Sequence, residues 1–256
     1  MTKIFLKILV AITFIGTVVV NYLANALPLN NITAGEVSDL YPNLFAPAGI
    51  TFSIWGLIYL LLGLFVLYYI GVFKKKTTNT KLLDNVSKYF VITGLANISW
   101  IFSWHYQIIF LSLILILVIL FCLIKIASMI AKANLKGKEY FFVELPFSVY
   151  FGWITVATIA NVTVLLVSLN WQGFGLPEVF WAVSIIIIGA MTGLWRMLKD
   201  KSVAYGLVFV WAYTGIIIKH VSPAEFAGQY PLVIITAGVC AFIFFATAIY
   251  LLTSKK

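Results

Sequence analysis

Long apolar segments alternate with short polar segments along the whole chain. Each apolar run holds about 18 or more residues, the length that crosses a bilayer as an α-helix. The runs do not show the apolar–polar alternation over about ten residues that marks outer-membrane β-strands. The pattern therefore predicts an all-α integral membrane protein, a polytopic bundle of eight transmembrane helices. The predicted spans are Ile4–Ala26, Pro47–Phe73, Leu82–Trp104, Ile108–Ala131, Phe141–Leu169, Val179–Met197, Ser202–Ile218 and Pro231–Thr253.

The composition excludes the soluble classes of protein. Of the 256 residues, 63% are hydrophobic and 10% are charged, whereas a soluble domain has about 45–50% apolar and about 25% charged residues. Eight spans with short loops leave no room for a separate soluble domain. The two cysteines, Cys122 and Cys240, lie in apolar runs and are interpreted as buried small hydrophobes without a disulfide.

The basic residues indicate how the chain crosses the membrane. If the N-terminus is inside, every one of the 17 lysines and arginines except Lys219 falls in a cytoplasmic segment, as the positive-inside rule requires. Glu36, Asp39, Glu178 and Glu225 then fall outside. We expect both termini to be cytoplasmic, in a bacterial plasma membrane. The formal charge of +9 follows from this topology, so a nucleic-acid partner is not expected.

The first apolar run and the loop after it each allow two interpretations. Lys3 and Lys7 precede an uninterrupted apolar stretch, and Ala24-Asn25-Ala26 resembles a signal-peptide cleavage site. Because the run is long enough to span, a retained helix is favoured. The segment 27–46 contains prolines, a glycine and asparagines, and is predicted to be an outside loop that forms a structured turn region or a lid.

Catalytic and metal-binding signatures of the usual kinds do not occur in the sequence. His105 and His220 are the only histidines, and neither has metal-ligand spacing to a second ligand. The few charged residues within spans lie near inner ends, where they can reach the interface. We predict no catalytic residues and no metal site. A haem or metal held by a histidine is a minor alternative.

Amide and aromatic side chains share faces of three predicted helices at spacings of three, four and eight residues. One interpretation is structural: asparagines hydrogen-bond between helices, and tryptophans pack or form an interfacial belt, which Trp104, Trp171 and Trp181 fit by position. The other is an aromatic-lined pocket for a flat ligand. The residues concerned are Trp55 and Tyr59 in the second span, Asn97, Trp100 and Trp104 in the third, and Trp153 and Asn161 in the fifth.

Three of these helices resemble one family. Residues 45–63 read FAPAGITFSIWGLIYLLLG, residues 95–100 read LANISW, and residues 145–161 read LPFSVYFGWITVATIAN. In order and spacing they resemble the second, third and fifth helices of the TspO/MBR family, the tryptophan-rich sensory proteins related to the mitochondrial translocator protein, or peripheral benzodiazepine receptor. The resemblance covers about residues 1–170.

The resemblance implies a TspO-like five-helix membrane core over residues 1–170, followed by three additional transmembrane helices over residues 171–256. It implies a membrane sensor or receptor that binds a planar hydrophobic ligand, such as a porphyrin or haem-type tetrapyrrole, with no required cofactor. The expected partners are membrane lipid and this ligand, and a homo-oligomer is an open alternative. The implied ligand-binding residues are Trp55, Tyr59, Asn97, Trp100, Trp104, Tyr150, Trp153 and Asn161.

Other functions stay open at this point. Val162 and Thr163 stand where some bacterial members of the family have a second tryptophan implicated in porphyrin breakdown, so enzyme activity is not expected. A transporter or export factor for a hydrophobic molecule is the main alternative, with Gly189 and Gly193 as a close-packing helix face. A structural or partner-binding membrane protein is the other.

Overall fold

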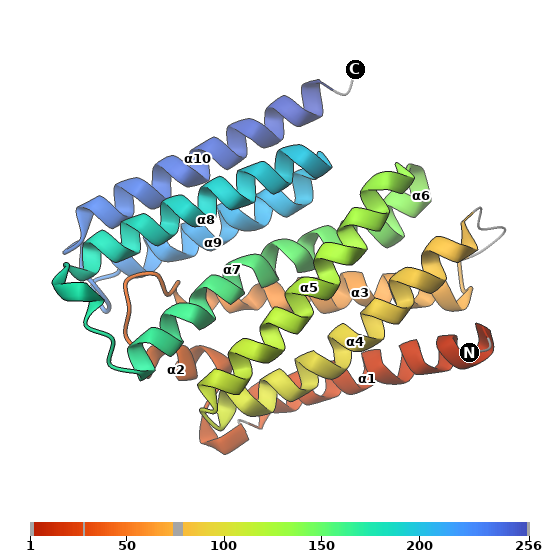
Figure 1. Ribbon diagram of the computed structural model, residues 1–256, viewed down its shortest axis with the longest axis horizontal. Coiled ribbons are helices and arrows are strands. Elements are labelled where there is room, and N and C mark those ends of the chain that lie inside the picture. The colour runs from red at the N-terminus through yellow and green to blue at the C-terminus, as the bar shows by residue number, and fades with distance from the viewer. Residues whose placement is uncertain (1–2, 28, 74–78, 255–256) are drawn as a thin grey trace. The chain divides into compact units, whose positions relative to one another are not determined.

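A computed structural model describes residues 3–27, 29–73 and 79–254 of the chain, and within these ranges it contains helices and no strand (Figure 1). The chain divides into two compact units. The first unit comprises Met1–Ala34 and Trp55–Phe151, and the second comprises Gly35–Ile54 and Gly152–Lys256. This division concerns packing within the chain, and the predicted boundary at residue 170, which rests on family resemblance, stays a prediction.

The eight predicted spans are all present as helices within the described ranges. Seven are long and apolar enough to cross a membrane, and α4 is not among them, because it is long enough but carries polar residues along its length, such as Lys81, Asp84 and Asn97. The structure thus confirms an all-α polytopic membrane protein. The long helices are α1 (Lys3–Ala26), α3 (Ile54–Ile70), α4 (Thr80–His105), α5 (Ile109–Ala133), α7 (Leu145–Ser168), α8 (Glu178–Asp200), α9 (Val203–Val221) and α10 (Pro231–Thr253). The short ones are η1 (Leu29–Asn31), α2 (Ala34–Asp39), η2 (Gly49–Ser53), α6 (Gly137–Glu139), η3 (Tyr140–Glu144) and η4 (Gly173–Gly175).

In the first unit, α4 packs between α1 and α5. Small and polar residues let α1 approach α4 closely: a Cβ on Gly94 would overlap the side chain of Thr13 and lie 3.1 Å from Thr17 Oγ1. The amide of Asn21 donates a hydrogen bond to Asn97 Oδ1 at 2.7 Å, and both residues are buried. Asn97 therefore joins two helices, as the structural interpretation of the asparagines predicts.

In the second unit, α8, α9 and α10 pack against one another (Figure 1). A Cβ on Gly193 would lie 2.7 Å from the ring of Phe209 and 2.8 Å from that of Phe244. A Cβ on Gly189 would lie 3.1 Å from the Tyr213 hydroxyl. The two glycines form the close-packing face predicted from the sequence, and aromatic rings fill the space that it leaves.

The segment Gly35–Ile54 is attached to α9 by four polar contacts. Three of the donors or acceptors on this segment are backbone groups, which would otherwise lack a partner at the end of an apolar bundle. These contacts hold Gly35–Ile54 against α9, and the outside loop or lid expected at residues 27–46 stays a prediction. The contacts are Lys219 Nζ with Asp39 Oδ1 at 2.6 Å, His220 Nε2 with Leu44 O at 2.9 Å, Ala48 N with Gly215 O at 3.0 Å, and Trp211 Nε1 with Thr51 O at 2.9 Å.

Candidate functional site

Five of the predicted ligand-binding residues form one aromatic cluster in the first unit. Trp55 stacks on Tyr59, with ring centroids 5.5 Å apart, and contacts Tyr150 edge-on at 6.1 Å. Trp55 also lies 6.4 Å from Trp100, which stacks on Trp104 at 5.4 Å. α3, α4 and α7 each contribute to this group, and a spacing of four residues places Trp55 with Tyr59, and Trp100 with Trp104, on single helix faces.

Two polar hydrogen-bond donors belong to this part of the unit. The Tyr59 hydroxyl is buried and has no hydrogen-bond partner among the described residues. Asn97 lies three residues before Trp100 on α4, and its Oδ1 is occupied by Asn21. Its Nδ2 is buried and is likewise without a partner in the described ranges. A buried donor left without a partner costs about 1–3 kcal/mol. Because two of them lie on the helices that carry the aromatic rings, we take this part of the unit as a candidate binding site.

Trp104 has a different role from the one its sequence position suggested. Its side chain is 4% exposed, and its indole Nε1 donates to Ala34 O at 3.0 Å. A tryptophan of an interfacial belt would expose its ring at the membrane surface. The belt interpretation of Trp104 is therefore wrong, and Trp104 packs inside the first unit.

Trp153 and Asn161 belong to the second unit, so the structure does not test whether they join the aromatic cluster. Trp153 contacts Phe52 edge-on, with centroids 5.9 Å apart. Both Trp153 and Asn161 are buried. Their place in a ligand site stays a prediction.

Both histidines contact backbone carbonyls. His105 Nδ1 lies 2.8 Å from Ile101 O, one helical turn before it, and His220 Nε2 lies 2.9 Å from Leu44 O. The described residues contain no group of three or more histidine, cysteine or acidic side chains that could hold a metal ion. These contacts give each histidine a role in fixing the backbone around it.

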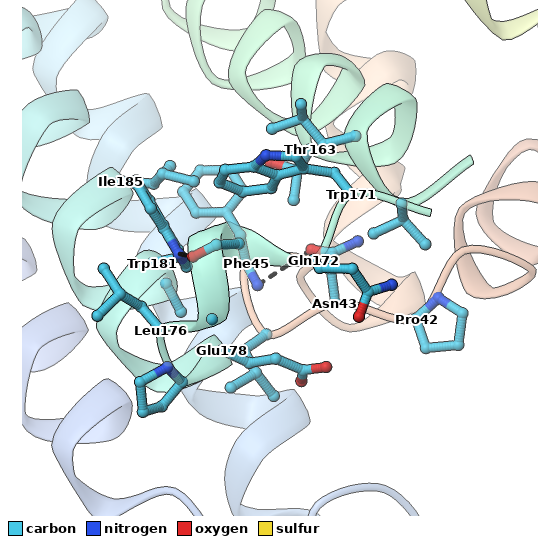
Figure 2. Close-up of a pocket in the computed structure, with 17 residues that line it drawn as sticks. Pro42, Asn43, Phe45, Thr163, Trp171, Gln172, Leu176, Glu178, Trp181 and Ile185 are labelled. Atoms are coloured by element: carbon cyan, nitrogen blue, oxygen red, sulfur yellow. Dashed lines mark hydrogen bonds between the residues drawn. The ribbon is translucent and has the colours of Figure 1, made fainter. Parts of the chain in front are cut away.

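The second unit contains a cavity of about 480 Å³ (Figure 2). Its walls come from residues 42–45, the last turns of α7, the segment 171–177 and the first turns of α8. None of the predicted ligand-binding residues lines it. Trp171 and Trp181, which the sequence placed in the interfacial belt, line it and meet with their rings 4.8 Å apart.

A tight turn places these two tryptophans together. Gly173 has a φ of +59°, which favours glycine, and its carbonyl accepts a hydrogen bond from Trp181 Nε1 at 2.9 Å. A Cβ at Gly173 would lie 2.9 Å from that same nitrogen. Pro177 then occupies the N-cap position of α8. The sequence Gln172-Gly-Phe-Gly-Leu-Pro177 is the signal that could have identified this structured segment.

Comparisons with known proteins agree with the resemblance seen in the helices. A family model described as TSPO-like protein matches residues 7–250. The match extends past residue 170 and includes α8, α9 and most of α10. The comparisons with curated proteins and with solved structures gave no match. Since the family model covers nearly the whole chain, the protein belongs to the TSPO-like family.

Proposed function

We propose that this TSPO-like membrane protein is a sensor or receptor that binds a planar hydrophobic ligand, a porphyrin or related tetrapyrrole, at the aromatic cluster. The observation that carries the proposal is the pair of buried donors, Tyr59 OH and Asn97 Nδ2, which lack partners among the described residues. Family membership supports a binding function in the membrane.

The chemistry of the cluster suits a tetrapyrrole. Its rings present π-faces that pack against a flat conjugated molecule. The two donors are neutral, and can hydrogen-bond a carboxylate or a ring nitrogen without the cost of a buried charge. A bound ligand that accepts both hydrogen bonds would remove the penalty of leaving them unmade.

Tyr59→Phe tests the proposal directly. In the free protein the hydroxyl has no partner among the described residues, so its removal should leave the melting temperature unchanged or slightly raised. In the complex it should remove one ligand hydrogen bond, and we expect the Kd for protoporphyrin to rise about tenfold, equivalent to about 1.4 kcal/mol. Saturable quenching of tryptophan fluorescence in detergent measures the Kd for protoporphyrin of the wild type and of the variant.

The matched control is Trp195→Phe. Trp195 lies on α8 in the second unit and is 59% exposed, so its replacement should change the total fluorescence but not the Kd. Quenching that does not saturate, or a Kd that Tyr59→Phe leaves unchanged, would rule out the aromatic cluster as the porphyrin site.

We further propose that the protein lies in a bacterial plasma membrane with both termini cytoplasmic. The Lys219–Asp39 ion pair supports this topology, because it holds the one basic residue of the outer set against an acid of the outer loop. Of the inner basic residues, Lys74, Lys75, Lys76, Lys255 and Lys256 lie outside the described ranges.

Cysteine labelling tests the topology, because Cys122 and Cys240 are both buried and give a low background. Glu225 and Lys199 are exposed and belong to opposite predicted sides. In intact cells a membrane-impermeant maleimide should label Glu225→Cys at once. Lys199→Cys should react only after permeabilisation, and the reverse pattern would invert the topology.

A further inference from the structure

The cavity of the second unit has the size and lining of a small-molecule site. Its volume of about 480 Å³ falls within the range of about 300–1,000 Å³ found for ligand pockets. Apolar side chains such as Phe45, Leu166 and Ile185 form much of its wall together with the rings of Trp171 and Trp181. It is built from residues of one unit only, and it shares no residue with the aromatic cluster.

Several polar side chains of the lining already make hydrogen bonds within the protein. Asn43 donates to Tyr41 O and accepts from the amides of Phe45 and Ala46, so its side chain is occupied. The Gln172 amide donates to Asn170 O at 3.0 Å. The Thr163 hydroxyl donates to Ile159 O at 2.9 Å. Gln172 keeps its second N–H and its oxygen, and the Thr163 hydroxyl keeps acceptor capacity, so these side chains do not by themselves select the charge of a ligand.

Glu178 is the charged side chain of the lining. It stands in the first turn of α8 and makes no ion pair with any described residue. Lys219 lies in the same unit but is held by Asp39 at 2.6 Å. Figure 2 shows the Glu178 carboxylate among the side chains around the cavity, together with the indole of Trp171. Glu178 is exposed, and it brings to the cavity a negative charge that forms no ion pair with a described residue.

These features select one class of ligand. A carboxylate attracts a protonated amine, and tryptophan faces add a cation–π attraction. The carboxylate would repel an anionic porphyrin. We propose that this cavity is a second binding site, distinct from the aromatic cluster, for a flat aromatic amine whose ring packs on Trp171 and Trp181 and whose cation pairs with Glu178.

The test compares two probes that share one tricyclic ring, 9-aminoacridine as the cation and acridine-9-carboxylate as the anion. Calorimetric titration of the full chain in detergent should give saturable binding of 9-aminoacridine. Glu178→Gln keeps the size of the side chain and removes its charge, and should raise the Kd about fivefold to tenfold. Acridine-9-carboxylate should bind the wild-type protein at least fivefold more weakly than the cation.

Two control variants show whether the cation binds at this cavity or elsewhere on the protein. Glu225→Gln removes an exposed acid that does not line the cavity, and should leave the Kd for 9-aminoacridine unchanged. Tyr59→Phe should also leave it unchanged, so the aromatic cluster and this cavity can fail independently. The inference is overturned if 9-aminoacridine shows no saturable binding, if Glu178→Gln binds it like wild type, or if Tyr59→Phe weakens it instead.

Discussion

Replacing Gly215 by alanine should lower the free energy of unfolding by about 1–3 kcal/mol, the usual cost of forcing extra volume into a packed site. The added Cβ would overlap Thr51 Oγ1 and lie 2.8 Å from Thr51 Cγ2. It would also strain the hydrogen bond from Ala48 N to Gly215 O. Glycine-to-alanine changes in helices ordinarily stabilise by up to about 1 kcal/mol. A loss of stability in Gly215→Ala would therefore indicate that Thr51 packs against Gly215.

Thermal unfolding in detergent measures this effect, with Gly238→Ala as the matched control. A Cβ on Gly238 would lie 3.9 Å from Ile217 Cδ1, an ordinary contact, so this variant should melt at the wild-type temperature or above it. Thr51→Ala removes a hydroxyl that has no partner among the described residues and should partly rescue Gly215→Ala. Equal melting temperatures for Gly215→Ala and the wild type, or additive effects in the double variant, would show that the segment Gly35–Ile54 does not pack against α9 at Gly215.

The helices were predictable because their information is local. The span predicted at Leu82–Trp104 forms as Thr80–His105, and the one predicted at Val179–Met197 forms as Glu178–Asp200. An unbroken apolar run must form a helix in hydrocarbon, because only a helix satisfies all its backbone hydrogen bonds within the segment. The helical spacing then determines which side chains share a helix face. The grouping of Trp100 with Trp104 follows from that spacing alone.

Contacts between segments far apart in the chain were not predictable in the same way. Nothing in the sequence of α4 identifies Asn21, on α1, as the residue that bonds to Asn97. The cavity requires residues 42–45 to meet residues 171–185, and this depends on how Gly35–Ile54 attaches to α9. The positions of Trp171 and Trp181 in the sequence predicted a place in the interfacial aromatic belt. Only the glycine-rich turn between them indicated that they belong to a structured segment.

Removing the partner of Lys219 is expected to have the largest effect on stability. Its ammonium group is 2.6 Å from Asp39 Oδ1, and the lysine side chain is 8% exposed while that of Asp39 is 50% exposed. Breaking a fully buried pair from one side costs about 3–5 kcal/mol. Because water reaches Asp39, we expect Asp39→Asn to lower the free energy of unfolding by about 2–3 kcal/mol. This is still more than the contribution of surface ion pairs, which is about 1 kcal/mol or less.

The reciprocal variant separates the charge from the packing. Lys219→Met keeps an apolar stem of similar length and leaves Asp39 facing water, so it should cost less than Asp39→Asn. Adding Lys219→Met to Asp39→Asn should recover stability, because no unpaired buried charge is left. Melting temperatures of the two single variants and the double variant give the coupling energy. If Lys219→Met costs more than Asp39→Asn, the lysine stabilises α9 by packing, and the pair does not hold the outer segment in place.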